Sequence, residues 1–280
     1  MDLDVQDTNK LVDGIKIPPA PYILNQLHGE MQKDSPEIQV IADIISKDVG
    51  ISSLILRTVN SSFFGLRSKV QSIQHATSLL GIGFTTNIVA GLALRRNFEE
   101  SEGTNAPNFW DSPVNVAMVA ASLARSLGVA EPDKMYMLGL FHNAGHSLMM
   151  QRFSDYPEFL DSVAISSEII TNAENERFKT DHAVLGFYLA RSWGLDRDIA
   201  DIIRDHHNAA ELLNLDASGY AHATMLAILK MAEHIDKLFW GVEHDSEWQQ
   251  IEQLVFEVLG ISKPDFEDMR DDMLEQLIAG

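Results

Sequence analysis

The chain contains no cysteine among its 280 residues. This absence excludes disulfide bonds and thiolate metal ligands. It also fits a protein that works in a reducing compartment, so we expect a cytoplasmic location.

Long apolar runs are missing as well. No window reaches the roughly 18 uninterrupted apolar residues that a membrane-spanning helix needs. Residues Met1 to Lys10 are polar and acidic, and they lack the basic start and apolar stretch of a signal peptide. We therefore expect neither a membrane span nor a secreted protein.

Positive charge is scarce. The chain has 21 Lys and Arg against 41 Asp and Glu, a formal net charge of −20. Nucleic-acid binding needs a basic surface that neutralises phosphates, and the tightest basic cluster is the pair Arg95 and Arg96. The same repulsion disfavours an anionic membrane surface. We expect neither nucleic acid nor membrane as a partner.

Apolar residues recur at helical spacing through most of the chain. Ile38, Ile41, Ile44 and Ile45 show the pattern, and Ser35-Pro36-Glu37 before them is typical of a helix start. Alternating strand-like runs are absent, so the sequence predicts an all-α fold. The predicted helices are 22–31, 37–46, 51–60, 72–80, 85–98, 114–127, 132–150, 157–175, 182–193, 196–207, 221–239, 248–259 and 264–278.

Five histidines suggest a metal site. His142 and His146 are four residues apart and would share a face of the predicted helix 132–150, while His182, His206 and His207 follow on later helices. Imidazoles from several helices can bind a divalent metal ion. The alternative is a polar stripe without a ligand. Successive helical residues point about 100° apart, so we expect at most one of His206 and His207 to face the site.

Several stretches, in this order and spacing, resemble the HDOD family, the HD-related output domain. They are Ile17-Pro-Pro-Ala-Pro21, Ile44-Ile-Ser-Lys-Asp48, Leu56-Arg-Thr-Val-Asn-Ser-Ser-Phe-Phe-Gly65, Ser72-Ile-Gln-His-Ala76 with Leu79-Leu-Gly81, Phe141-His-Asn-Ala-Gly-His146, His182 to Gly186, Trp193-Gly-Leu195 and His206-His207. The resemblance implies a two-lobed helical bundle, with an HDOD-type N-terminal lobe and a C-terminal lobe like that of HD phosphohydrolases.

The resemblance also implies a domain organisation. We expect a frayed N-terminus at 1–14 and an HDOD domain at 15–212, with the boundary between its lobes near the acidic, Gly- and Pro-containing stretch 99–108. The remaining helices, 213–280, are expected to pack on the HD-like lobe.

Active HD enzymes hold one or two metal ions with His and Asp, and the metals activate water for phosphoester hydrolysis. Carried over residue by residue, that ligand set is incomplete here. Ser112 stands where the first histidine belongs, Asn143 replaces the aspartate after His142, and His146 replaces a lysine. The last aspartate falls near Glu233. The later histidines His182 and His206 or His207 are kept. A neutral amide is a weaker ligand than a carboxylate, so metal affinity should fall.

These losses favour a bacterial signal-transduction or regulatory module without catalytic residues, acting through protein partners or a ligand such as a nucleotide. The alternative is a metal-dependent phosphohydrolase that acts on a nucleotide or cyclic dinucleotide. No cofactor is certain, but a divalent metal ion could bind a vestigial site. Its candidate ligands are His142, Asn143, His146, His182, His206 and His207.

A second candidate surface lies at the junction of a helix and a turn, where Arg57, Asn60, Phe63 and Phe64 cluster. They could form a partner-binding surface. The structural alternative, which we favour, is that Asn60 caps the helix and the phenylalanines are packing anchors.

Overall fold

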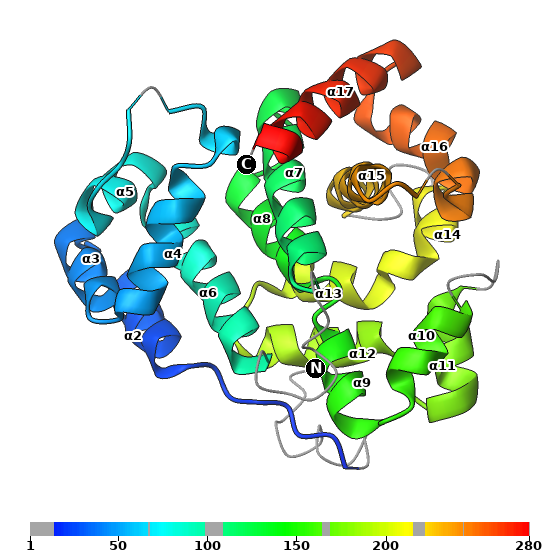
Figure 1. The fold of residues 1–280 in the computed structure, drawn as a ribbon, viewed down its shortest axis with the longest axis horizontal. Coiled ribbons are helices and arrows are strands. Elements are labelled where there is room, and N and C mark those ends of the chain that lie inside the picture. The colour runs from blue at the N-terminus through cyan, green and yellow to red at the C-terminus, as the bar shows by residue number, and fades with distance from the viewer. Residues whose placement is uncertain are drawn as a thin grey trace. The chain divides into compact units, whose positions relative to one another are not determined.

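The structure is a computed structural model that describes residues 14–66, 68–98, 109–163, 169–214, 222–242 and 244–279. Every regular element in these ranges is a helix (Figure 1), which confirms the all-α prediction. The predicted frayed N-terminus, apart from its last residue, and the predicted lobe boundary lie outside the described residues. The described chain forms two compact units, which are presented separately below.

The smaller unit comprises residues 20–97 and 271–280. Apolar side chains at helical spacing, such as Leu24, Ile41, Ile45 and Ile55, are fully buried in it. Its helices are α2 (Tyr22–Met31), α3 (Ile38–Ser46), α4 (Val49–Val59), η1 (Ser62–Phe64), α5 (Ile73–Leu80) and α6 (Ile82–Phe98), together with the end of α17 (Lys263–Ala279).

The larger unit contains residues 98–270 and the extended segment that leads up to residue 19. Trp193, which is buried, donates a hydrogen bond from its indole nitrogen to the carbonyl oxygen of Pro18 at 3.0 Å and so holds this segment. The helices of the unit are α7 (Asp111–Leu127), α8 (Pro132–Phe141), α9 (Gly145–Arg152), α10 (Tyr156–Val163), α11 (Ile170–Phe178), α12 (His182–Ser192), α13 (Arg197–Asp205), η2 (His206–Asn208), α14 (Ala209–Leu213), α15 (Ala223–Phe239), α16 (Ser246–Leu259) and the start of α17.

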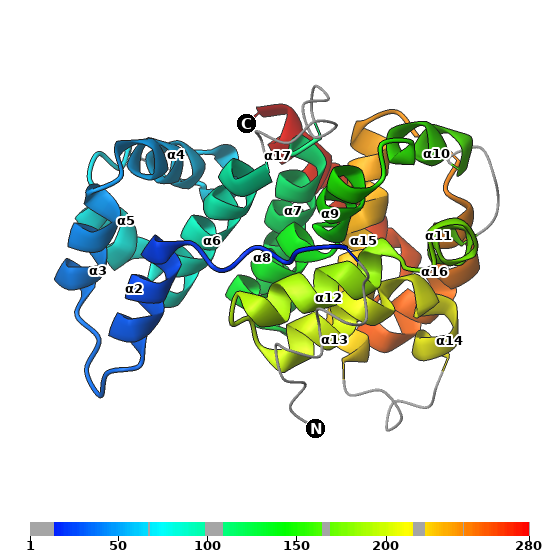
Figure 2. The ribbon, with the colours of Figure 1, turned by 90° about the horizontal axis from the view of Figure 1, so that it is seen from below.

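Close helix packing builds the centre of this unit. Helices α7 and α8 lie side by side, and α15 packs against both and against α14 and α16 (Figures 1 and 2). Small residues permit this contact: a Cβ atom at Gly139 of α8 would lie 2.7 Å from the Cα atom of Ala117 of α7. Helix α15 also packs against α8, and the site described below includes His142, directly after α8, and Glu233 of α15.

The prediction of one helix over 132–150 is wrong. Helix α8 ends at Phe141 and α9 begins at Gly145, with a turn between them. Gly145 packs directly on the backbone of α12, since a Cβ atom there would lie 1.9 Å from the carbonyl oxygen of His182. The helix breaks because α9 must turn to make this contact, whereas the apolar pattern runs on through the break.

The prediction of one helix over 157–175 is also wrong, because the structure has two helices there, α10 and α11. Ile169, just before α11, has extended backbone angles (φ −65°, ψ 120°) that a continuous helix does not contain. The residues 164–168 between the helices lie outside the described part of the chain.

No single helix in the described ranges is long and apolar enough to span a membrane. The bent pair α5 and α6 passes the same length and composition test only when its two helices are taken together.

The Gly145 contact can be tested by mutation. We expect Gly145→Ala to lower the free energy of unfolding by about 3 kcal/mol, because the added methyl group meets backbone atoms that cannot rotate away. Gly29→Ala in α2 is the matched control: it has no atom within 4 Å of the new Cβ, and helix propensity predicts a gain of about 0.5–1 kcal/mol. Urea unfolding of both variants measures the difference, and equal stabilities would contradict this account.

Candidate functional site

Four of the histidines singled out in the sequence converge inside the larger unit. His142 follows the last residue of α8, His182 is the first residue of α12, and His206 and His207 lie in η2. The ring centroid of His206 lies 5.5 Å from that of His142 and 5.6 Å from that of His182. The ring centroids of His182 and His207 are 4.9 Å apart. We call these four residues the histidine cluster.

Hydrogen bonds to backbone carbonyl oxygens fix the orientation of two of these rings. The Nδ1 atoms of His142 and His206 each lie 2.7 Å from a backbone carbonyl oxygen, those of Gly139 and Ile203. A carbonyl oxygen only accepts, so each Nδ1 carries the proton and each Nε2 of the neutral ring has a free lone pair. His206 Nε2 is buried and has no hydrogen-bond partner within the described part of the chain.

Both members of the His206–His207 pair face the cluster, so the expectation that at most one would do so is wrong. His207 Nε2 lies 3.0 Å from His182 Nε2, and ligand atoms of His182, His206 and His207 lie within 4.8 Å of one another. The reason is local: α13 ends at Asp205, and the pair lies in the 3₁₀ turn η2, to which regular α-helix spacing does not apply.

His146 takes a different position from the one that its spacing suggested. Because the helix breaks after His142, the two residues do not share a helix face. The His146 ring instead stacks on His182, with centroids 3.9 Å apart, and its Nδ1 lies 2.6 Å from the hydroxyl oxygen of Tyr156. The neighbouring Asn143 has a buried side-chain oxygen with no partner among the described residues.

A buried carboxylate that the sequence interpretation missed orients the cluster. Glu174 of α11 accepts hydrogen bonds from the backbone N–H of His182 (3.0 Å), from its Nδ1 (2.8 Å) and from the hydroxyl of Tyr156. Burial raises the pKa of Glu174. Glu174 lies in the polar run 172–177, which reads as a solvated face, so its position in the sequence gave no signal.

A second carboxylate faces the cluster from α15. Glu233 Oε1 lies 3.4 Å from His142 Nε2, near the position to which the family resemblance carried the last metal-binding aspartate. Its other oxygen, Oε2, pairs with Lys230 Nζ at 2.8 Å, and that ammonium also contacts Glu247 Oε1 at 2.7 Å. Lys230 is 2 % exposed, so its positive charge is buried next to the cluster.

Ser112, at the position of the missing first histidine, makes a structural hydrogen bond. Its hydroxyl donates to Asp236 Oδ2 at 2.5 Å, and Asn115 donates to Oδ1 of the same carboxylate at 2.9 Å. Trp240 donates a third bond to Asp236 from its indole nitrogen. Asp236, another residue that the sequence did not single out, therefore serves as an acceptor for three side chains.

The donor set fits a metal ion. Neutral imidazole nitrogens suit zinc, nickel, copper or iron better than magnesium or calcium. The Nε2 atoms of His182 and His207 share a hydrogen bond at 3.0 Å, and with His206 they bring three imidazole ligand atoms within 4.8 Å of one another. A carboxylate behind a ligating histidine, as Glu174 is behind His182, is the usual support of such a ligand.

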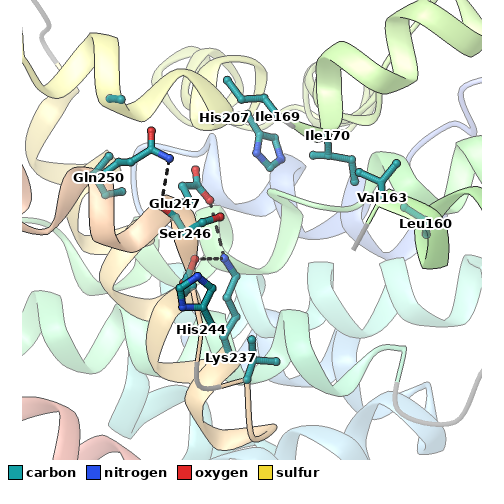
Figure 3. A pocket seen from close by; sticks show the side chains of 14 residues that line it. Leu160, Val163, Ile169, Ile170, His207, Lys237, His244, Ser246, Glu247 and Gln250 are labelled. Atoms are coloured by element: carbon teal, nitrogen blue, oxygen red, sulfur yellow. Dashed lines mark hydrogen bonds and ion pairs between the residues drawn. The ribbon is translucent and has the colours of Figure 1, made fainter. Parts of the chain in front are cut away.

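A cavity of about 490 Å³ opens beside the cluster, and His207 is the cluster residue that lines it (Figure 3). One wall is apolar, with Leu160, Val163, Ile169 and Ile170. The opposite side is polar and comes from α15, α16 and the segment between them, with Lys237, His244, Asp245, Ser246, Glu247 and Gln250. Its one lysine is paired with Asp245 at 3.0 Å.

Burial keeps the imidazoles uncharged. Desolvation is the largest cause that lowers the pKa of each histidine of the cluster and of His146, and it lowers the pKa of His182 to about 3. The Lys230 ammonium lowers the pKa of all four cluster histidines further. The nearby Glu233 carboxylate partly offsets this for His142 and His182.

The second candidate surface lies in the smaller unit. Asn60 exchanges hydrogen bonds with both backbone groups of Val70 and donates to the carbonyl oxygen of Leu56, so it fastens the end of α4 to the following segment. Phe64 meets Phe84 edge to face at 5.8 Å. Phe63 is half-buried and Arg57 is exposed. These contacts agree with the structural role of Asn60 and Phe64, while a partner-binding role of the four residues stays a prediction.

The HDOD domain model matches residues 17–209 of the chain. This chain belongs to the HDOD domain family. An uncharacterized protein of Treponema pallidum (strain Nichols) is 25% identical to this HDOD chain over 200 residues, which are 69% of this chain and 38% of that protein. The chain thus spans well under half of that relative's length.

Solved structures share the HDOD fold. A protein of Marinobacter aquaeolei VT8, provisionally named a signal transduction protein, has a TM-score of 0.70 and 20% identity, over 100% of this chain and 61% of its own. A protein of Shewanella amazonensis SB2B, provisionally named a metal-dependent phosphohydrolase, has a TM-score of 0.69 and 18% identity, over 98% and 97% of the two chains. At these identities the likeness establishes the fold alone.

The buried histidines predict acid sensitivity of the metal-free protein. Their pKa values are lowered in the folded state, so below about pH 6.5 the unfolded chain binds more protons than the folded chain. The free energy of unfolding therefore decreases as the pH is lowered. Each histidine that stays neutral contributes up to about 1.4 kcal/mol per pH unit. We expect urea unfolding in the presence of a chelator to give a steep loss of stability from pH 6.5 to pH 5. A constant free energy of unfolding over that range would show that these rings are not buried as described.

Proposed function

We propose that this HDOD chain is a non-hydrolytic signalling module of the cytoplasm. Its HD-type site binds a single divalent transition-metal ion through His182, His206 and His207 and lacks the anionic ligands of a two-metal hydrolase. The module then acts through protein partners or a small ligand.

One observation carries the proposal: each carboxylate around the cluster is already engaged. Glu233 is paired with Lys230, Glu174 is held behind His182, and Asp236 accepts from three side chains. Asn143, in the position of the dyad aspartate, has no charge. Hydrolysis by two metal ions needs an anionic group that holds both and a metal-bound water between them. The engaged carboxylates argue against such a centre.

The alternative function, a metal-dependent phosphohydrolase, has two supports. The retained histidines could bind metal, and the Shewanella protein of the same fold carries that provisional name. The cavity beside the cluster speaks against a phosphate-rich substrate, because Lys237, its lining lysine, is paired with Asp245 and lies near Glu247. The residues that line the cavity therefore include no lysine that is free to bind the phosphates of a nucleotide.

Two further observations favour a signalling role. The Marinobacter protein that shares the fold is provisionally named a signal transduction protein. The cavity has the size of a small-molecule site, which supports a ligand as input.

An activity assay tests the proposal. We expect no hydrolysis of bis(p-nitrophenyl) phosphate or of cyclic dinucleotides above the rate of a His142→Ala variant, with Mn²⁺, Ni²⁺ or Mg²⁺ added. The histidine variant is the control for a contaminating phosphatase. Turnover by the unaltered chain that disappears in His142→Ala would replace the proposed function with the alternative.

Metal binding through the cluster has its own test. We expect Glu174→Gln to weaken Ni²⁺ or Zn²⁺ binding about 10- to 100-fold, because the amide supports His182 less well than the carboxylate does. Isothermal titration measures the affinity. Gln39→Glu on the exposed face of α3 is a control that also changes one charge but lies in the other unit. Equal nickel affinity of Glu174→Gln and the unaltered chain would remove His182 from the ligand set.

A further inference from the structure

The least expected group near the histidine cluster is a buried lysine. Lys230 lies on α15 with its side chain 1 % exposed, although burying an ammonium ion is costly unless it is paired. It is paired twice, with Glu233 at 2.8 Å and with Glu247 at 2.7 Å. One positive charge therefore lies between two carboxylates, from two helices, in the interior of the larger unit.

The position of this ammonium relates it to the metal-type site. Glu233 contacts Lys230 with one oxygen, while its other oxygen lies 3.4 Å from His142 Nε2. That second oxygen is buried, and none of the residues that the structure describes forms a hydrogen bond with it. Two carboxylates that meet at a single positive charge are the kind of ligands that would hold a divalent cation such as Mg²⁺ or Mn²⁺.

We infer that the Lys230 ammonium is a built-in replacement for a cation and keeps metal ions out of a carboxylate site formed by Glu233 and Glu247. This site is separate from the nitrogen site of His182, His206 and His207. The inference goes beyond the proposed function, since it would hold even if the nitrogen site bound nothing.

Charge explains why a lysine is effective there. The ammonium compensates one of the two carboxylate charges and donates a hydrogen bond to each. It needs no supply of metal and is never released, so the site stays closed to Mg²⁺ or Mn²⁺ from solution. A divalent ion that entered beside it would meet like-charge repulsion in an interior that screens charge poorly.

The carboxylate site has an approach from solvent. Glu247 is 31 % exposed, and it lines the cavity, where Figure 3 shows it beside Lys237. Lys237 Nζ lies 3.0 Å from Asp245 and 3.8 Å from Glu247. Removing the Lys230 charge should therefore leave the two carboxylates accessible, while Lys237 remains held by Asp245.

The test is to remove the ammonium and count metal ions. Lys230→Met keeps most of the apolar stem and leaves the place of the ammonium empty. We expect this variant to bind about one more Mn²⁺ per chain than the unaltered protein, because two carboxylates suit a hard cation. Equilibrium dialysis of the full chain, with free Mn²⁺ read by electron paramagnetic resonance, measures the difference.

Two control variants separate a site from a general charge effect. Lys237→Met loses the same charge next to Glu247 and should gain no Mn²⁺. The double variant Lys230→Met with Glu233→Gln removes one carboxylate ligand and should lose the gain. An equal gain in Lys237→Met, or no gain in Lys230→Met, would overturn the inference.

Loss of the buried ammonium also destabilises the fold, and this gives a second readout. If Lys230→Met is unfolded without metal, we expect Mn²⁺ to restore its helical circular dichroism, and Lys230→Gln provides a milder variant for the same titration. A variant that Mn²⁺ does not refold would also overturn the inference. Nickel binding by the histidine cluster is measured in parallel and tests the proposed function separately. We expect it to persist in the folded Lys230→Met protein, because Lys230 is not one of the nitrogen ligands.

Discussion

The burial of uncharged imidazoles governs the rest of the larger unit. A ring nitrogen removed from water must find a partner or remain available for a ligand. The Nδ1 atoms of His142 and His206 are satisfied by carbonyl oxygens at the ends of their own helices, and that of His182 by Glu174. With these bonds in place, ligand atoms of His182, His206 and His207 lie within 4.8 Å of one another, and His142 Nε2 lies against Glu233. The ends of α8 and α13 and the start of α12 therefore have to meet at one point.

Charge within this unit is arranged in compensated pairs around that point. Glu233 and Glu247 flank Lys230, and Asp245 accepts from His234 and Lys237. A carboxylate paired in this way cannot also bridge two metal ions without leaving an ammonium unpaired. An unpaired buried ammonium lowers the free energy of unfolding by about 3–5 kcal/mol. This distribution of charge, together with Ser112 and Asn143 at two ligand positions, is the basis of the proposed non-hydrolytic function.

Much of the fold and part of the site could be predicted from the sequence. The 3.6-residue apolar period identified the helices, because it depends on which face is buried and not on the neighbour that covers it. It failed at 132–150, where Gly145 packs on the backbone of α12. It failed for the His206–His207 pair for the same kind of reason, because a 3₁₀ turn replaces the helix there. The replacement of two ligands by Ser112 and Asn143 could be recognised in the sequence, because both residues occupy positions in a known order of motifs.

The sequence by itself determined the helical class, the family, the absence of thiolate ligands and the candidate histidines. Only the tertiary structure decided which polar groups meet. Glu174 and Asp236 lie in segments that look like ordinary helix surface, and Lys230 stands within the apolar run 226–232. Their roles arise from contacts with residues 8 to 124 positions away. The local apolar pattern of a sequence indicates which helix face is buried. It does not indicate which distant carboxylate contacts a given histidine ring, because that depends on how the helices pack.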